Sequence, residues 1–209
     1  MTIGIAGCDS GVGVTHLALA LGSYCCSKQR RRVAYIELHT KNEISRLLSE
    51  EQLCSLLRRQ TAGAASFAAD LPCFCLDGVD YYPQASGNTV PILLNRGYDC
   101  LILDSGRLEE AGLPEFLRCD RKLVIGSLAV WKAWKYEAFL QKLRAFTDLG
   151  EGFSYLVQAG NKKSISDFSR SHQISMCQVP FINNPFRIEK DLFLFLEELL
   201  AAPVRQLRA

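Results

Sequence analysis

The sequence predicts an α/β fold, with one doubly wound, mainly parallel sheet flanked by helices. Short apolar segments alternate with longer segments of helical periodicity, which is typical of βαβ units. The first apolar segment runs directly into a glycine-rich turn and then a helical segment. A chain of 209 residues without an evident linker or repeat fits one domain, residues 1–209.

Six apolar segments are expected to form strands, because each is short, rich in aliphatic side chains and bounded by polar or turn residues. They are Thr2–Gly7, Arg32–Leu38, Val79–Tyr82, Asp99–Asp104, Arg121–Gly126 and Phe153–Val157. A further apolar segment, Ser175–Phe181, ends in a proline turn.

Helices are expected where apolar residues recur every three to four positions. The segments are Thr15–Lys28, Glu43–Arg59, Val130–Phe146 and Ile188–Leu200, with a short helix that has Pro91 in its first turn and runs to Asn95. Trp131 and Trp134 share one face of the helix expected over Val130–Phe146. Core packing is expected for both, and a partner-binding surface is the alternative.

Composition excludes several classes of protein. A net charge of +2 indicates neither nucleic acid nor an acidic membrane as a partner, and the basic run 28–32 is expected to be a solvated turn. No apolar run is long enough to span a bilayer, and the amino terminus lacks the basic region of a signal peptide, so a cytoplasmic location is expected. The nine cysteines include one CxC pair and no second pair at zinc-ligand spacing, which favours free thiols.

The segment Gly7-Cys8-Asp9-Ser10-Gly11-Val12-Gly13-Val14-Thr15 carries the clearest functional signal. Glycines between a strand and a helix let successive backbone N–H groups point at an anion. Compared with the P-loop pattern G-x-x-x-x-G-K-[ST], Cys8 stands for the first glycine and Val14 for the lysine. Gly13 and Thr15 match.

The loop resembles the deviant P-loop of the MinD/ParA ATPases, K-G-G-x-G-K-[ST], with Asp9 at the family's signature lysine. Further segments resemble the family in the same order along most of the chain. They are RRVAYIELH (strand and switch region), LDGVDYYPQASGN, GYDCLILDSG (Walker B aspartate) and VPFINNPF, which is similar to the segment beside the adenine.

The resemblance implies ATP or ADP with Mg²⁺ as cofactors, or no cofactor if the loop is vestigial. It places the nucleotide-binding positions at Gly11, Val12, Gly13, Val14 and Thr15. It places the Mg²⁺ ligands at Thr15 and Asp104, and switch-like positions at Glu37 and His39. Plainer interpretations remain open: a tight turn without ligand, Asp104 as a helix N-cap, and Glu37 and His39 as solvent-facing residues at a strand end.

The departures from the family predict a pseudo-ATPase that acts as a scaffold or positioning protein. Val14 and Asp9 replace two lysines, and His39 replaces an aspartate that positions water in the family. The implied partners are proteins, such as an active MinD/ParA relative or a pilus or secretion component, and a homodimer. The alternative is a weak or partner-activated ATPase that still binds ATP and Mg²⁺.

A third hypothesis is an NAD(P)-binding protein similar to short-chain dehydrogenases, because Gly7, Gly11 and Gly13 fit their glycine pattern and Glu37 ends the second strand. The Tyr-x-x-x-Lys pair of those enzymes is matched only by Tyr24 and Lys28, on the wrong helix. Membrane insertion is not expected, because the tail after Pro203 has few apolar residues.

Overall fold

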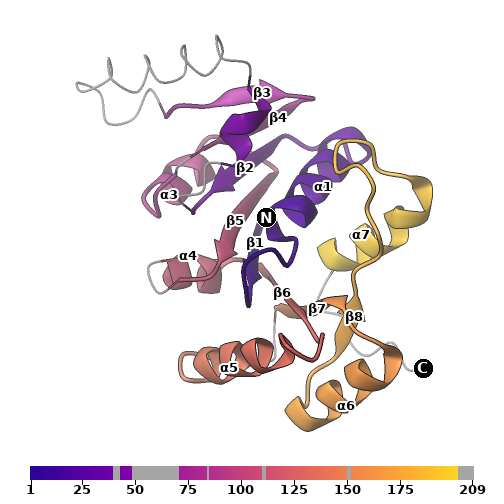
Figure 1. The fold of residues 1–209 in the computed structure, drawn as a ribbon. Helices are drawn as coiled ribbons and strands as arrows, with labels where there is room; N and C mark the ends of the chain where they lie inside the picture. Colours follow the sequence, from indigo (N-terminus) through magenta and orange to yellow (C-terminus); the bar gives the residue numbers. More distant parts are fainter. Residues whose placement is uncertain (40–42, 49–70, 84, 110–111, 150–151, 202–209) are drawn as a thin grey trace.

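The computed structural model describes residues 1–39, 43–48, 71–83, 85–109, 112–149 and 152–201. Its centre is an eight-stranded sheet in the order β3-β4-β2-β5-β1-β6-β7-β8, and every described pair is parallel except β3 with β4 (Figure 1). The strands are β1 (Thr2–Gly7), β2 (Val33–Glu37), β3 (Phe74–Leu76), β4 (Val79–Tyr82), β5 (Cys100–Arg107), β6 (Arg121–Ser127), β7 (Phe153–Ala159) and β8 (Met176–Gln178). The predicted doubly wound, mainly parallel sheet is confirmed.

Helices cover both faces of the sheet. The helical segments are α1 (Val14–Ser27), η1 (Ile44–Leu47), α3 (Thr89–Leu94), α4 (Leu113–Arg118), α5 (Ala133–Arg144), α6 (Lys162–His172), η3 (Lys190–Leu192) and α7 (Phe193–Leu200). Buried side chains of α1 and α7 form one core with Ile3, Ile5 and Tyr35. Those of α3, α4 and α5 form two cores on the opposite face.

Strand β1 lies at the middle of the sheet, paired in parallel with β5 on one side and β6 on the other. All six of its residues are buried. A strand buried on both faces requires apolar side chains at successive positions, which explains its continuous apolar sequence. The residues that follow β1 therefore leave the sheet at its carboxyl edge, where ligands bind in open α/β sheets.

Several elements differ from the sequence-based prediction. Strand β5 continues to Arg107, so Asp104 lies within the strand and the N-cap interpretation is wrong. Of the helix predicted over Glu43–Arg59, the described residues form a 3-10 turn, η1, which ends at an extended Leu48, and residues 49–59 lie outside the described part of the chain. Strand β3 and helices α4 and α6 were not predicted. Strand β3 and helix α4 are short, and α6 is a mostly polar helix with no buried residue, in which Ile165 and Phe168 pack against the core.

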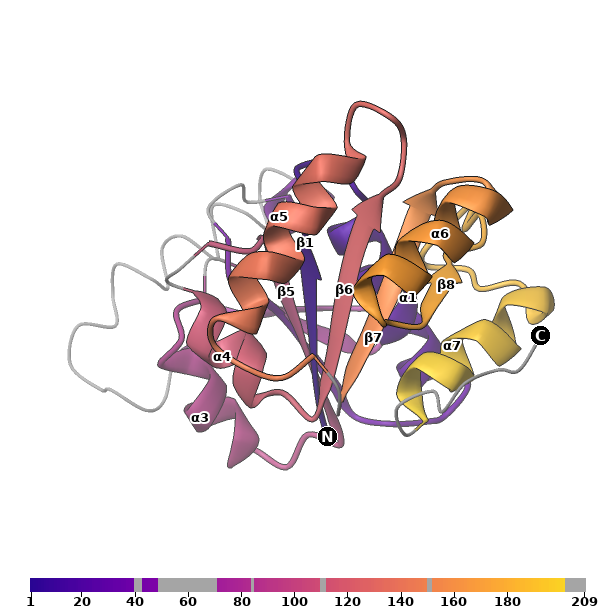
Figure 2. The same ribbon diagram turned by 90° about the horizontal axis from the view of Figure 1, so that it is seen from below.

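The prediction that Trp131 and Trp134 pack in the core is wrong. Trp131 is 74% exposed, Trp134 is 62% exposed, and the adjacent Val130 is 91% exposed. These residues occupy the connection from β6 to α5 and the first turn of α5, and Figure 2 shows this connection projecting beyond the body of the molecule. The core face of α5 is formed instead by Tyr136, Leu140 and Leu143.

The described residues contain no helix long and apolar enough to cross a membrane. The eight cysteines among them are free thiols, and Cys54 lies outside the described ranges.

We expect substitutions on the two faces of α5 to differ sharply. Tyr136 is fully buried, and its hydroxyl donates to the carbonyls of Val124 and Leu156, both at 3.2 Å. Tyr136→Ala should cost about 3–5 kcal/mol of unfolding free energy, because it leaves a large cavity and two carbonyls without this donor. Trp134→Ala, two positions away, should change stability by less than about 1 kcal/mol.

Urea denaturation of the two variants and the parent chain measures both effects. An equal loss of stability in both variants would contradict the assignment of Trp134 to the surface.

Candidate functional site

The glycine-rich loop connects the buried end of β1 to the first turn of α1. Gly11 and Gly13 have φ angles of +72° and +91°, in the left-handed region that side chains with a Cβ disfavour. The Cys8 N–H donates to the Ile125 carbonyl at 2.9 Å, and Gly13 caps α1 with its carbonyl accepting from the Leu17 N–H at 3.0 Å. The backbone thus has the tight turn at a helix amino terminus that is typical of an anion site.

The side chains of this loop do not supply positive charge. Val12 and Val14 are buried and belong to the core between the sheet and α1. Val14 stands at the lysine of the P-loop pattern, and its Cγ2 lies 2.8 Å from the position that a Cβ on Gly7 would take. An apolar side chain therefore packs inward at the position where a P-loop holds an ammonium group.

Asp9 forms ion pairs with two lysines of the α5 region. Its Oδ2 lies 2.9 Å from Lys135 Nζ and 3.4 Å from Lys132 Nζ, and Lys132 Nζ also approaches the Ser10 carbonyl at 3.5 Å. The hydrogen bond from Lys135 holds the pKa of Asp9 below its usual value. The carboxylate at the signature-lysine position is therefore ionised and neutralised by its own chain.

Asp104 lies beneath the loop and is fully buried. Its Oδ2 accepts from the Tyr35 hydroxyl at 2.5 Å, and its Oδ1 accepts from the Gly106 N–H at 2.8 Å. The Thr15 hydroxyl, on the first turn of α1, also lowers the pKa of Asp104. The structure thus brings together Thr15 and Asp104, the two residues predicted as Mg²⁺ ligands.

Glu37 and His39 also belong to this buried cluster, so the prediction that they face solvent is wrong. The Glu37 side chain is 0% exposed and that of His39 is 10% exposed. His39 Nε2 lies 3.4 Å from Asp104 Oδ2, and its Nδ1 lies 3.8 Å from Glu37 Oε1. Strand register explains the arrangement, because Glu37 at the end of β2 pairs with Asp104 of β5.

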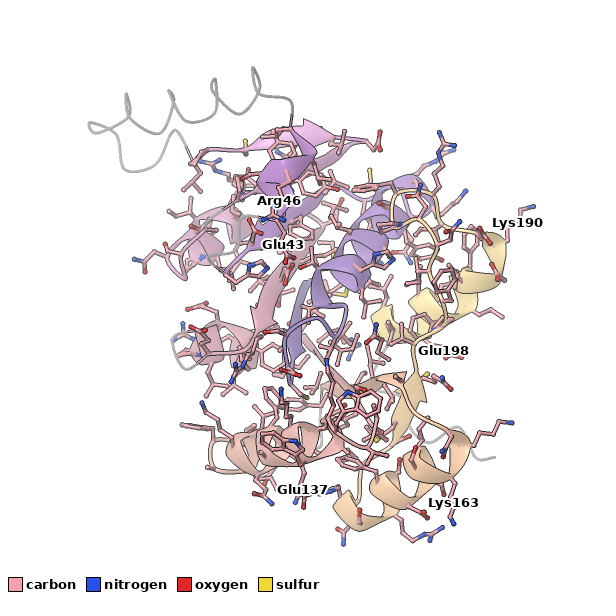
Figure 3. The ribbon with its side chains drawn as sticks, in the orientation of Figure 1. Glu43, Arg46, Glu137, Lys163, Lys190 and Glu198 are labelled. Atoms are coloured by element: carbon pink, nitrogen blue, oxygen red, sulfur yellow. The ribbon has the colours of Figure 1, made fainter. Side chains whose placement is uncertain are left out.

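Glu43 completes the cluster from the segment after β2 (Figure 3). Its backbone N–H donates to Glu37 Oε1 at 2.8 Å, and its Oε2 accepts from the Thr15 hydroxyl at 2.9 Å. Through these two hydrogen bonds, Glu43 connects the first turn of α1 to the end of β2. The cluster therefore holds three carboxylates around one imidazole.

The carboxylates shift the pKa of His39 upward. Burial lowers its pKa, but the contact with Asp104 and the charges of Glu37 and Glu43 outweigh burial and raise it above its usual value. For Asp104, burial raises the pKa. The contact with His39 and the hydroxyls of Tyr35 and Thr15 outweigh burial and lower the pKa of Asp104 below its usual value. Both shifts favour an imidazolium–carboxylate pair.

Two cavities flank the loop. The first, of about 270 Å³, is bounded by the loop residues Asp9–Thr15 and by His16, His39, Glu43, Gly106 and Arg107. The second, of about 530 Å³, lies on the other side of the loop and is largely apolar. Its lining includes Ile125, Gln158, Gln178 and the segment Val179–Ile182, which the sequence resemblance places beside an adenine.

The residues around Asp104 do not fit a magnesium ion. Mg²⁺ requires near-octahedral oxygen ligands at about 2.0–2.1 Å and retains several waters. Here both oxygens of Asp104 already accept hydrogen bonds, and the His39 ring lies in contact with Oδ2. In the part of the chain that the structure describes, no group of three or more His, Cys, Asp or Glu side chains is arranged to hold a metal.

Sequence reasoning missed the partners of the loop. Lys132 and Lys135 follow Trp131 and Trp134 in the sequence, but nothing in that pattern indicates contact with Asp9, which is more than 120 residues away. Glu43 was assigned only to a helical period. His16, which received no role, contacts the Ile182 carbonyl through Nε2 at 2.8 Å and lines both cavities.

The His39–Asp104 pair predicts a specific pH dependence of stability. Because the folded-state pKa of His39 is raised, its stabilisation is complete below the unfolded value of about 6.5 and is lost as pH rises through the folded value. Asp104, with its lowered pKa, contributes above its unfolded value of about 4. The stability difference between the parent chain and His39→Asn should therefore be largest near pH 5–6 and should shrink as the pH rises above about 6.5.

Denaturation of the parent chain, His39→Asn and the control His172→Asn across this range measures the effect. A difference that stays constant or grows with pH would show that His39 is not held as an imidazolium.

No protein-family model and no curated protein matches the sequence, whereas solved structures do. A ParA family ATPase from Chlorobium tepidum TLS superposes with a TM-score of 0.64 and 12% identity, covering 95% of this chain and 88% of that one. MinD cell division protein from Aquifex aeolicus gives 0.58 and 15%, covering 94% and 86%. Apo McdA from Cyanthece gives 0.64 and 16%, covering 96% and 99%. The chain has the fold of the ParA and MinD ATPases.

Proposed function

We propose that this chain is a degenerate member of the MinD/ParA family, a pseudo-ATPase that acts through contacts with other proteins. One observation carries the proposal: the loop keeps its anion-binding backbone, but its cationic side chains are replaced. Asp9 and Val14 stand at the two lysine positions, Asp9 is paired with Lys132 and Lys135, and Val14 is buried.

The expected loss of rate is large. Phosphoryl transfer depends on fixed positive charge beside the γ-phosphate, and a single such charge, the arginine finger, is worth about 10³–10⁵ in rate. Here Asp9, at the position of one of these lysines, lines the cavity that the loop encloses and is paired with Lys132 and Lys135. His39 occupies the position of the family's water-positioning aspartate and contacts Asp104 instead.

Exposed aromatic side chains support a role in protein binding. Val130, Trp131 and Trp134 project at the β6–α5 connection, next to the lysines that hold Asp9. Tryptophan is enriched among the residues that dominate binding energy at protein interfaces. A MinD cell division protein from Aquifex aeolicus, of the same fold, is known in complex with MinC. A scaffold or positioning role through a protein partner fits these features.

A weak or partner-activated ATPase is the second candidate. Gly11 and Gly13 keep the conformation of an anion-binding turn, and the larger cavity has space and two amide side chains for a heteroaromatic ring. A plasmid partition protein from Borrelia burgdorferi with this fold is bound to AMPPNP. The NAD(P) hypothesis has less support, because Tyr24 is buried and donates to Glu197 on α7, away from both cavities.

Calorimetric titration with ATP and ADP, paired with a phosphate-release assay, tests the proposal. We expect turnover at least about 10³-fold below the value of about 10 s⁻¹ that is typical of enzymes. Thr15→Ala is the matched control, because a trace activity that it leaves unchanged comes from a contaminant. Turnover that Thr15→Ala abolishes would overturn the pseudo-ATPase assignment in favour of the weak ATPase.

A further inference from the structure

The imidazole ring of His39 packs closely against the backbone beneath the glycine loop. Gly106 has a φ angle of +54°, and a Cβ at that position would lie 2.7 Å from His39 Cδ2. Any side chain at residue 106 would therefore collide with the imidazole. The ring is bounded by this bare backbone on one side and by Glu37 and Asp104 on others.

The ring lies where a cation bound to Asp104 would have to be. Asp104 Oδ2 faces His39 Nε2 at 3.4 Å, and the same oxygen accepts from the Tyr35 hydroxyl. The remaining oxygen, Oδ1, is engaged by the Gly106 N–H. A Mg²⁺ ion bound directly to Asp104 would therefore have to displace one of these contacts, because both carboxylate oxygens are already engaged.

The ring nitrogens of His39 also lie beside the carboxylates that a bound cation would compensate. A buried carboxylate requires a compensating partner, and a divalent cation is the usual partner at this position of a P-loop fold. In this chain the two ring nitrogens lie beside Asp104 and Glu37, and Glu43 is drawn to Thr15 instead. One ring therefore contacts two of the three carboxylates of the cluster, on the side of Asp104 where an ion would otherwise bind.

We propose that His39 takes the place of the divalent cation beside Asp104, so that the glycine-loop site works without Mg²⁺. This inference rests on the proposed pseudo-ATPase function and deepens it. The site keeps its phosphate-facing backbone and its apolar cavity, while its metal position is closed by a side chain of the same protein.

Binding of Mn²⁺, a paramagnetic substitute for Mg²⁺, tests this directly. In electron paramagnetic resonance titrations of the full chain, the signal of free Mn²⁺ should not fall without nucleotide. With ADP it should fall no further than it does in an ADP solution that contains no protein. His39→Asp removes the ring and adds a carboxylate, and it should bind Mn²⁺ at least about 10-fold more tightly than the parent chain. Adding Asp104→Asn to that variant should abolish the gain.

The parent chain provides a second readout that does not depend on any variant. It contains three histidines, whose ring protons can be followed by NMR during addition of Mn²⁺. The His39 signals should broaden no more than those of His172, on α6. Selective broadening of His39, or Mn²⁺ binding by the parent chain that Asp104→Asn removes, would overturn the inference.

The two proposals fail separately. Hydrolysis of ATP without divalent cations would refute the pseudo-ATPase function and leave the metal-free site intact. Mn²⁺ bound at Asp104 in a chain that hydrolyses nothing would refute only the role of His39.

Discussion

The parallel pairing of β1 with β5 and β6 is the constraint on which the rest of the structure depends. Because β1 is hydrogen-bonded on both sides and buried on both faces, the chain can leave it only at the carboxyl edge of the sheet. The same pairing aligns Ile5 with Asp104, and β2 then aligns Glu37 with Asp104. The loop and the polar cluster beneath it are thus consequences of sheet register.

The site combines the backbone of an anion-binding turn with side chains that are apolar or paired within the chain. Backbone N–H groups and the α1 amino terminus favour an anion whatever side chains the loop carries, since they depend only on φ and ψ. Side chains decide whether a phosphate can be bound with metal and cleaved. Here Val14 faces the core, Asp9 is paired with Lys135, and His39 neutralises Asp104. The loop thus carries no cationic side chain of its own, and the two lysines beside it are paired with Asp9.

The Asp9 ion pairs also connect the loop to the exposed tryptophans. Lys132 and Lys135 flank Trp134, and Lys135 Nζ lies 5.7 Å from the centroid of the Trp134 ring. The indole N–H of Trp134 donates to the Trp131 carbonyl at 3.2 Å, which keeps this turn compact. A protein that contacts the tryptophans would therefore also contact the side chains that neutralise the loop.

The sequence by itself determined the fold class, the order of the major strands, and the placement of the glycine loop between β1 and α1. These follow from local patterns, namely apolar runs, helical periodicity and glycine spacing. The family resemblance also singled out Thr15, Glu37, His39 and Asp104, and in the structure these residues lie close together. The sequence did not predict β3 and α4, which are short, or α6, which has few apolar residues.

Only the tertiary structure decided which of these residues are buried and what neutralises them. The tryptophans were expected in the core but are exposed, and His39 was considered solvent-facing but is largely buried. Helical spacing reveals that two residues share a face but not which element covers that face, and a position after a strand does not reveal burial either. Asp9 pairs with Lys135 of α5, and Asp104 contacts Tyr35 of β2 and His39 just after β2, all far away along the chain. Such contacts are set by sheet register and helix packing, so no local pattern in the sequence records them.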